Sequence, residues 1–148
     1  MNHAFKKFKQ FIQEKEAYPI YVGIFLDKSN RSKLLKEVPA DYEIVTADHV
    51  TLMFKDFSNW PKLGYKMGQT VIITVTGQAS DDGVQAVTVD ANSNNNNPHI
   101  TISHSKDRKA FQSNALLQRF TPEKMRLKLK GKVGTYMSDG SISYNEDI

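Results

Sequence analysis

The sequence contains no cysteine among its 148 residues. Disulfide bonds, thiolate nucleophiles and cysteine-ligated zinc sites are therefore excluded. Long hydrophobic runs are also missing: none approaches the roughly 20 residues of a membrane-spanning helix, and the start lacks the apolar core of a secretory signal. We therefore expect a soluble intracellular protein, cytoplasmic or nuclear, that does not bind a membrane.

Motifs for common cofactors are missing as well. The sequence has no Walker phosphate loop, glycine-rich dinucleotide turn, metalloprotease zinc motif or EF-hand loop, which predicts neither a cofactor nor a bound metal. Hydrophobic residues make up 39% of the chain and charged residues 24%, as in ordinary globular proteins. The length suits one domain, residues 1–148, and we expect a monomer.

A His-x-Thr triplet occurs twice in the sequence, each time within a short apolar run. The first triplet is His49–Thr51 and the second is His99–Thr101. Both runs are rich in β-branched or aromatic residues, which predicts two strands. Side chains alternate along a strand, so the His and Thr of each triplet share one face and the residue between them points to an apolar face.

Two histidines and two threonines that converge would suit phosphoryl chemistry. A neutral imidazole can accept a proton from a nucleophile while a protonated one donates to a leaving oxygen, and the ordinary His pKa of about 6.5 makes both forms accessible. Hydroxyl groups can stabilise the non-bridging oxygens of the phosphoryl group. We predict that His49, Thr51, His99 and Thr101 are catalytic. A single such triplet usually has no function, and a structural pair is the alternative reading.

The paired triplets resemble the motifs of the two-histidine (2H) phosphoesterase superfamily, over residues 18–144. Within it the chain is most similar to the cyclic-phosphodiesterase domain of fungal-type tRNA ligases and related RNA-repair proteins. The resemblance implies an α+β, bilobal fold with two antiparallel sheets facing a central cleft and helices outside. It also implies metal-independent hydrolysis of 2′,3′-cyclic phosphate RNA ends, or of related 2′-linked phosphodiesters, with water giving a 2′-phosphate.

The resemblance permits two other functions. Related 2H enzymes degrade 2′–5′ oligoadenylates or cyclic oligonucleotide signals, often for a virus or phage that evades host defence. A protein that kept the cleft but lost activity would be an RNA-binding module. The expected partners are therefore RNA ends or small cyclic or oligonucleotide substrates.

Substrate-binding residues are predicted in two places. Trp60 and Tyr65 follow the first triplet and could stack on a base, although Trp60 could instead fill the end of a core. Between residues 106 and 132 there are nine basic and two acidic residues. The alternating Arg126, Lys128 and Lys130 in this segment could follow an RNA backbone, or could be solvated cations that protect a sheet edge.

The other expected elements frame these motifs. Apolar spacing predicts an N-terminal amphipathic helix over residues 1–17 and another helix over 109–120 with Phe111 on its inner face. Between them, Asp27 or Ser29 could cap a helix that runs to about residue 36. Strands are expected at 19–26, 70–77, 84–90 and 125–133, with hairpin turns at 82–83 and 139–140. Residues 91–98 should form a flexible Asn-rich loop that could cover the site. His104, out of phase with the second triplet, is expected in a loop.

Overall fold

The computed structural model describes residues 16–146, so the predicted N-terminal helix over residues 1–17 lies almost wholly outside the described residues. The elements in chain order are β1 (Pro19–Leu26), α2 (Lys28–Glu37), β2 (Ile44–Val45), β3 (His49–Phe54), α3 (Trp60–Leu63), β4 (Thr70–Ser80), β5 (Val84–Asp90), β6 (His99–His104), the 3-10 helix η1 (Ala110–Gln112), α4 (Ser113–Arg119), β7 (Glu123–Met137) and β8 (Ile142–Ser143).

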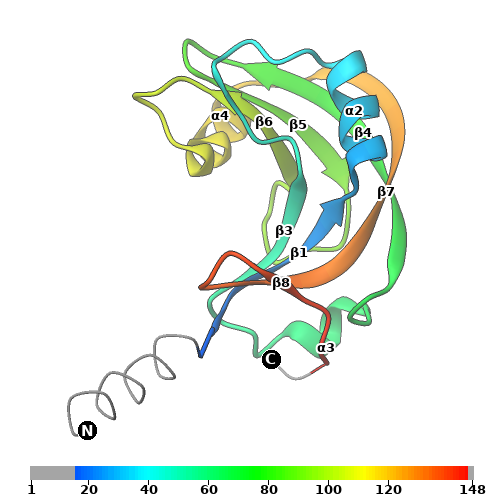
Figure 1. Ribbon diagram of the computed structural model, residues 1–148. Coiled ribbons are helices and arrows are strands. Elements are labelled where there is room, and N and C mark those ends of the chain that lie inside the picture. The colour runs from blue at the N-terminus through cyan, green and yellow to red at the C-terminus, as the bar shows by residue number, and fades with distance from the viewer. Residues whose placement is uncertain (1–15, 147–148) are drawn as a thin grey trace, which may run out of the picture.

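The described strands form one antiparallel sheet in the order β2-β6-β5-β4-β7-β1-β3, with β8 paired to β7. The sheet curls into a half-barrel, with few helices around it (Figure 1). The predicted α+β class with antiparallel strands is confirmed, but the strands join one sheet where the sequence predicted two. The reason lies in β4 and β7, which are 11 and 15 residues long and pair with each other along most of their length, and so connect the two halves.

Each strand divides its side chains between two faces of the sheet. One face, called here the core face, carries the main hydrophobic cluster, which includes Val50 and Leu52 of β3 and Ile100 and Ile102 of β6. Leu34 of α2 and Trp60 of α3 pack into the same cluster. The opposite face, called here the site face, carries the His and Thr side chains of both triplets. The predicted alternation of side chains in both triplet strands is therefore confirmed.

The two helices beside the sheet differ from their predictions in detail. Asp27 begins α2, because its Oδ1 accepts a hydrogen bond from the backbone N–H of Asn30 at 2.7 Å. The predicted helix over residues 109–120 divides into η1 and α4. Leu116 and Leu117 of α4 pack on the site face of β5, whereas Phe111, predicted on the inner side, is 71% exposed. Its position in η1, before α4 begins, takes it off the inner stripe.

The chain changes its pairing partner at Ala47, which has a φ of 54°. Before this residue the backbone pairs with β6, and the N–H groups of Thr46 and Ala47 donate to the carbonyls of Ile102 and Thr101. After it, β3 pairs with β1. The segment 44–48 therefore belongs to both ends of the sheet, and it brings β3 close to β6.

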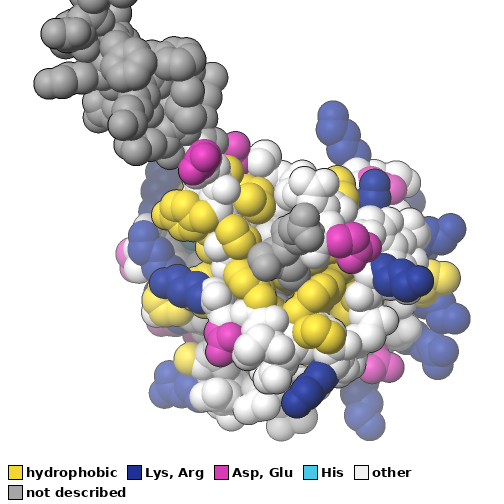
Figure 2. Space-filling view, turned by 90° about the horizontal axis from the view of Figure 1, so that it is seen from below, with side chains coloured by type: hydrophobic (Ala, Val, Ile, Leu, Met, Phe, Trp, Pro, Cys, Tyr) yellow, Lys and Arg dark blue, Asp and Glu magenta, His cyan; other side chains and the backbone are white. Residues whose placement is uncertain are grey.

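The surface carries large hydrophobic side chains as well as charged ones. Figure 2, which views the molecule from below, shows hydrophobic side chains gathered in the centre of that face and Lys and Arg side chains around its edge. Over the described residues, the large hydrophobic side chains that are exposed are Tyr18, Ile44, Val45, Phe54, Ile72, Phe111, Phe120, Ile142 and Tyr144.

Candidate active site

A cavity of about 360 Å³ lies between the two triplet strands, on the site face. The side chains of His49, Thr51, His99 and Thr101 all line it, so the structure brings together the four residues that the sequence singled out. The volume lies in the range of small-molecule sites. The other lining residues are Tyr21, Thr46, Phe54, Asn95, Ala110, Phe111 and Asn114.

His49 lies in a partly open, aromatic setting. Its Nδ1 is 2.7 Å from Oδ1 of Asp48, and its side chain is 28% exposed. The imidazole stacks on Tyr21, with ring centroids 4.9 Å apart, and on Phe25, at 5.8 Å. A carboxylate only accepts hydrogen bonds, so Nδ1 carries a proton and Nε2 is the nitrogen left to act on a substrate.

Tyr21 behaves as a neutral packing partner of this imidazole. Burial, followed by the negative charge of Asp48 and the nearby Tyr136, raises the pKa of Tyr21. Tyr21 also stacks on Tyr136, with ring centroids 5.0 Å apart. The phenol therefore stays protonated at neutral pH and holds the His49 ring in place without competing as a base.

His99 lies in a drier setting. Its Nδ1 is 2.7 Å from the backbone carbonyl oxygen of Asn97, so Nδ1 again carries a proton. Burial lowers the pKa of His99; the hydrogen bond to Asn97 opposes this shift, and the nearby His49 adds to it. At neutral pH His99 is therefore a neutral imidazole with an unprotonated Nε2, the form that a general base requires.

The two threonines differ in what they already contact. Oγ1 of Thr101 donates to the carbonyl of Ala110 at 3.2 Å and shares a hydrogen bond with Oγ of Ser113 at 2.8 Å. Ser113 is fully buried. Oγ1 of Thr51 has no hydrogen bond to any residue in the described part of the chain. Thr51 is therefore the hydroxyl that is ready for a ligand, and Thr101 also fixes the wall of the cavity.

The Asn-rich segment 91–98 is a loop, as predicted, and one of its side chains lines the cavity. Backbone N–H of Asn94 donates to the carbonyl of Leu52. Nδ2 of Asn95 donates to Oδ1 of Asn114 at 2.9 Å. The loop therefore contacts both β3 and α4 across the cavity, while its flexibility stays a prediction.

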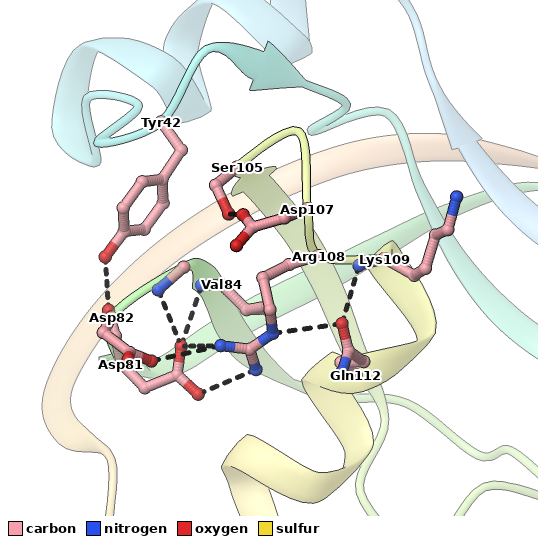
Figure 3. A network of polar contacts seen from close by, with 10 residues as sticks. Tyr42, Asp81, Asp82, Val84, Ser105, Asp107, Arg108, Lys109 and Gln112 are labelled. Atoms are coloured by element: carbon pink, nitrogen blue, oxygen red, sulfur yellow. Dashed lines mark hydrogen bonds and ion pairs between the residues drawn. The ribbon is translucent and has the colours of Figure 1, made fainter.

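Arg108 fixes the segment that leads into the opposite wall (Figure 3). Its guanidinium pairs with Asp81 and Asp82 at 3.1 Å each, and its Nε donates to Oε1 of Gln112. Burial alone would raise the pKa of Asp81, but hydrogen bonds from Arg108 and from the backbone of Val84 and Gly83 lower it. The ionised pair ties the turn between β4 and β5 to η1, which carries two of the cavity residues.

The predicted aromatic contacts lie away from this cavity. Trp60 is 8% exposed and belongs to the hydrophobic core, which was the alternative to its stacking on a base. Tyr65 stacks on Trp60, and its hydroxyl donates to the carbonyl of Asn92 and accepts from the Asn92 N–H. Tyr65 lines a different cavity, between β4 and the Asn92 segment. Neither ring is among the residues around the two histidines.

The basic residues of β7 are exposed, and they also lie outside the cavity. Arg126, Lys128 and Lys130 alternate with the apolar residues of the strand. The strand register places Lys128 and Lys130 on the site face, the same face as the triplets. His104 ends β6, where the sequence predicted a loop, and its Nδ1 contacts the carbonyl of Ser105.

Sequence reasoning did not assign Asp48, Tyr21, Phe54 or Phe111 to the site. Asp48 directly precedes the first triplet, and that position is the one signal that could have marked it. The other three come from β1, the end of β3 and η1. Only the pairing of β1 with β3 and the placement of η1 against β6 bring them together, and neither is visible in a local pattern.

The lining of the cavity contains no Lys, Arg, Asp or Glu, so its two histidines are its only side chains that can become positively charged. Over residues 16–146, no three His, Asp or Glu side chains gather closely enough to hold a metal ion. In the same part of the chain, no helix is both long and apolar enough to cross a membrane.

The chain was compared with protein-family models and with curated proteins, and nothing matches in either comparison.

Proposed function

We propose that this protein is a metal-independent phosphodiesterase that opens 2′,3′-cyclic phosphates at RNA ends, or cleaves related 2′-linked phosphodiesters. One observation carries the proposal: both histidines and both threonines of the repeated triplet line a single cavity large enough for a nucleotide phosphate. Two histidines with different surroundings are what acid–base catalysis requires.

The surroundings assign a role to each histidine. His99 acts as the general base: its Nδ1–H is held by the Asn97 carbonyl, and its neutral Nε2 takes a proton from the attacking water. His49 acts as the general acid: its Nδ1–H donates to Asp48, and in the protonated form its Nε2–H gives a proton to the leaving 3′ oxygen. The new P–O bond forms as the bond to the 3′ oxygen breaks, which leaves a 2′-phosphate and a free 3′-hydroxyl.

The threonines complete the phosphate site. The hydroxyl of Thr51 donates to a non-bridging oxygen from the start. Thr101 donates to a second oxygen after its hydrogen moves away from the Ala110 carbonyl, with Ser113 still in contact. Because the lining has no Lys or Arg, the charge of the phosphate is met by the His49 imidazolium and by these hydroxyls.

Membership of the 2H phosphoesterase superfamily is part of the proposal. In that reading each triplet strand belongs to one lobe, β3 with β1 and α2 in the first, and β6 with β5 and α4 in the second. The long strands β4 and β7 then connect the lobes. The same proposal includes that the protein acts as a monomer, on RNA in the cytoplasm or nucleus, and without a cofactor.

A second enzymatic reading shares this site. A 2′–5′ oligoadenylate or a cyclic oligonucleotide presents the same phosphodiester to the same residues, and Phe54 and Phe111, 58% and 71% exposed, offer apolar surface beside the cavity to a base of either kind. The non-enzymatic reading, an inactive RNA-binding module, is less well supported because all four triplet residues line the cavity.

The test is a turnover assay in EDTA with a panel of substrates: 2′,3′-cyclic mononucleotides, RNA ending in a cyclic phosphate, 2′–5′ oligoadenylate and cyclic dinucleotides. We expect a 2′-phosphate product from the first two, and no turnover by the His49→Ala and His99→Ala variants. A product from only the last two would favour the second enzymatic reading. Activity lost in EDTA and restored by a divalent ion would overturn the metal-independent mechanism.

A further inference from the structure

A groove of about 310 Å³ lies on the site face beside the catalytic cavity, between β7, β8 and the end of β1. Its lining combines two cations, Lys130 and Lys132, with two aromatic rings, Phe25 and Tyr144. Nζ of Lys132 lies 4.1 Å from the ring centroid of Tyr144. The name "β7–β8 groove" refers below to this cavity, whose lining includes these four residues. Cations beside aromatic rings are the usual make-up of a single-stranded nucleic acid site.

The strand register connects this groove with the catalytic histidine. His49 is paired with Phe25, and Phe25 is paired with Lys132, so the three side chains form one row across β3, β1 and β7 on the same face. The Phe25 ring bridges the two sites, because it stacks on His49 at 5.8 Å and also lines the groove. With strands about 4.8 Å apart, Lys132 lies roughly 10 Å from His49 along this row.

The charge of the groove is available to a ligand. Lys130 and Lys132 are exposed, and Lys132 lies where β7 is paired on both sides, so it protects no sheet edge. The groove has one carboxylate, that of Asp27. Its Oδ1 already accepts from the backbone and the side chain of Asn30, at 2.7 and 3.0 Å. An anion in the groove would therefore meet two lysines and a carboxylate that is already engaged.

We propose that the β7–β8 groove binds the nucleotide that precedes the reacting end of a single-stranded RNA. The lysines contact its phosphate, and Tyr144 offers a ring for its base. A terminal 2′,3′-cyclic phosphate blocks the 3′ end, so the rest of the RNA lies on its 5′ side. The row from His49 through Phe25 to Lys132 is where we place this 5′ side. The proposal rests on the proposed function and narrows its substrate class to RNA ends rather than cyclic mononucleotides.

The test compares two substrates in two double variants. Lys130→Gln/Lys132→Gln removes two charges from the groove, and Lys62→Gln/Lys66→Gln removes two exposed charges elsewhere. kcat/KM is measured in EDTA for a 2′,3′-cyclic mononucleotide and for a short RNA ending in the same cyclic phosphate. We expect the groove variant to lose at least about fivefold on the RNA and to keep its mononucleotide rate, and the control variant to keep both.

Binding of an uncleavable RNA with a 3′-phosphate supplies a readout that does not need turnover. The slope of log K against log salt should fall by about 1.4 in the groove variant, roughly 0.7 for each lost phosphate contact of a single strand. Tyr144→Ala should weaken the same binding at least about fivefold, through lost stacking.

The outcomes separate the two proposals. Equal RNA and mononucleotide kinetics in the groove variant, with an unchanged salt slope, would overturn the groove while leaving the phosphodiesterase proposal intact. A wild-type protein without turnover on either substrate would overturn the proposed function, and the binding slopes would still decide whether the groove takes RNA.

Discussion

The two triplets have the same residue pattern and opposite surroundings. His49 is partly open, stacked against two aromatic rings and paired with a carboxylate. His99 is half-buried, contacts a neutral carbonyl and has a pKa that desolvation lowers. Thr51 is ready for a ligand, while Thr101 holds the wall at Ala110 and Ser113. A repeated motif therefore does not imply repeated roles: the neighbours, which the motif does not encode, give the two imidazoles different surroundings, and the acid and base roles that we propose depend on that difference.

Removing either imidazole should have the largest effect. His49→Ala and His99→Ala should each lower kcat by at least on the order of 10²-fold, because each deletes one proton-transfer group. The double variant should be far less than additively worse, since acid and base act in one step. Steady-state kinetics on a cyclic-phosphate substrate measures this. Full activity in either single variant would return that triplet to a purely structural role.

Asp48→Asn should have the next largest effect, and it acts on the first triplet alone. The amide can turn its NH₂ group toward Nδ1, which selects the tautomer with Nε2–H and removes the charge partner of the imidazolium. A charge-assisted hydrogen bond of about 1.5–3 kcal/mol corresponds to a loss of roughly 10- to 100-fold in kcat. KM should change little. Asp56→Asn, at an exposed carboxylate elsewhere, serves as the matched control, and an equal loss there would remove the argument.

The threonines should separate activity from stability. Thr51→Ala should lower kcat about tenfold with an unchanged melting temperature, because its hydroxyl contacts no described residue. Thr101→Ala should also destabilise the fold by about 1–2 kcal/mol, since it leaves the buried Ser113 hydroxyl short of a partner. Thermal unfolding of both variants beside the kinetics tests this, and Thr101→Ser should restore stability. Equal melting temperatures for the two Ala variants would contradict the asymmetry.

The smallest expected effect is a change in stability with pH that His99 causes. Its pKa in the folded protein lies below the unfolded value of about 6.5, so the unfolded chain binds more protons as the pH falls below that value. Stability is therefore kept above pH 6.5 and declines below it. His99→Gln should flatten this decline in denaturant titrations below about pH 6.5. In the wild type, kcat/KM should fall on the acid side at a pH below 6.5, as the base becomes protonated.

Local patterns predicted much of the secondary structure. The alternation in the two triplet strands, the Asp27 cap and the hairpin turns follow from side-chain periodicity and turn chemistry, which act over a few residues. The single sheet was not predicted, because the pairing of β4 with β7 joins residues about fifty positions apart. Phe111 was misplaced because helical periodicity was extended over a 3-10 turn.

The site shows the same division. Its four central residues came from the repeated motif, and the structure brings them to one cavity. Trp60, in contrast, is a residue type that can stack on a base, but it lies in the hydrophobic core. Asp48 and Tyr21 act through contacts across strands, so their part in the site depends on register, which the sequence does not fix by itself.

The segment 44–48 has a consequence for native-state dynamics. The backbone N–H groups of Thr46 and Ala47 donate to β6, and the carbonyl of Asp48 accepts from Leu26 of β1. Opening this segment alone would separate the two triplets while leaving the β4–β7 pairing in place. The site can therefore be lost by a sub-global opening that costs less free energy than unfolding. In hydrogen exchange, the amides of Thr46 and Ala47 would report how often the two triplets are held together, and the amides of β4 and β7 would report how often the sheet itself is intact.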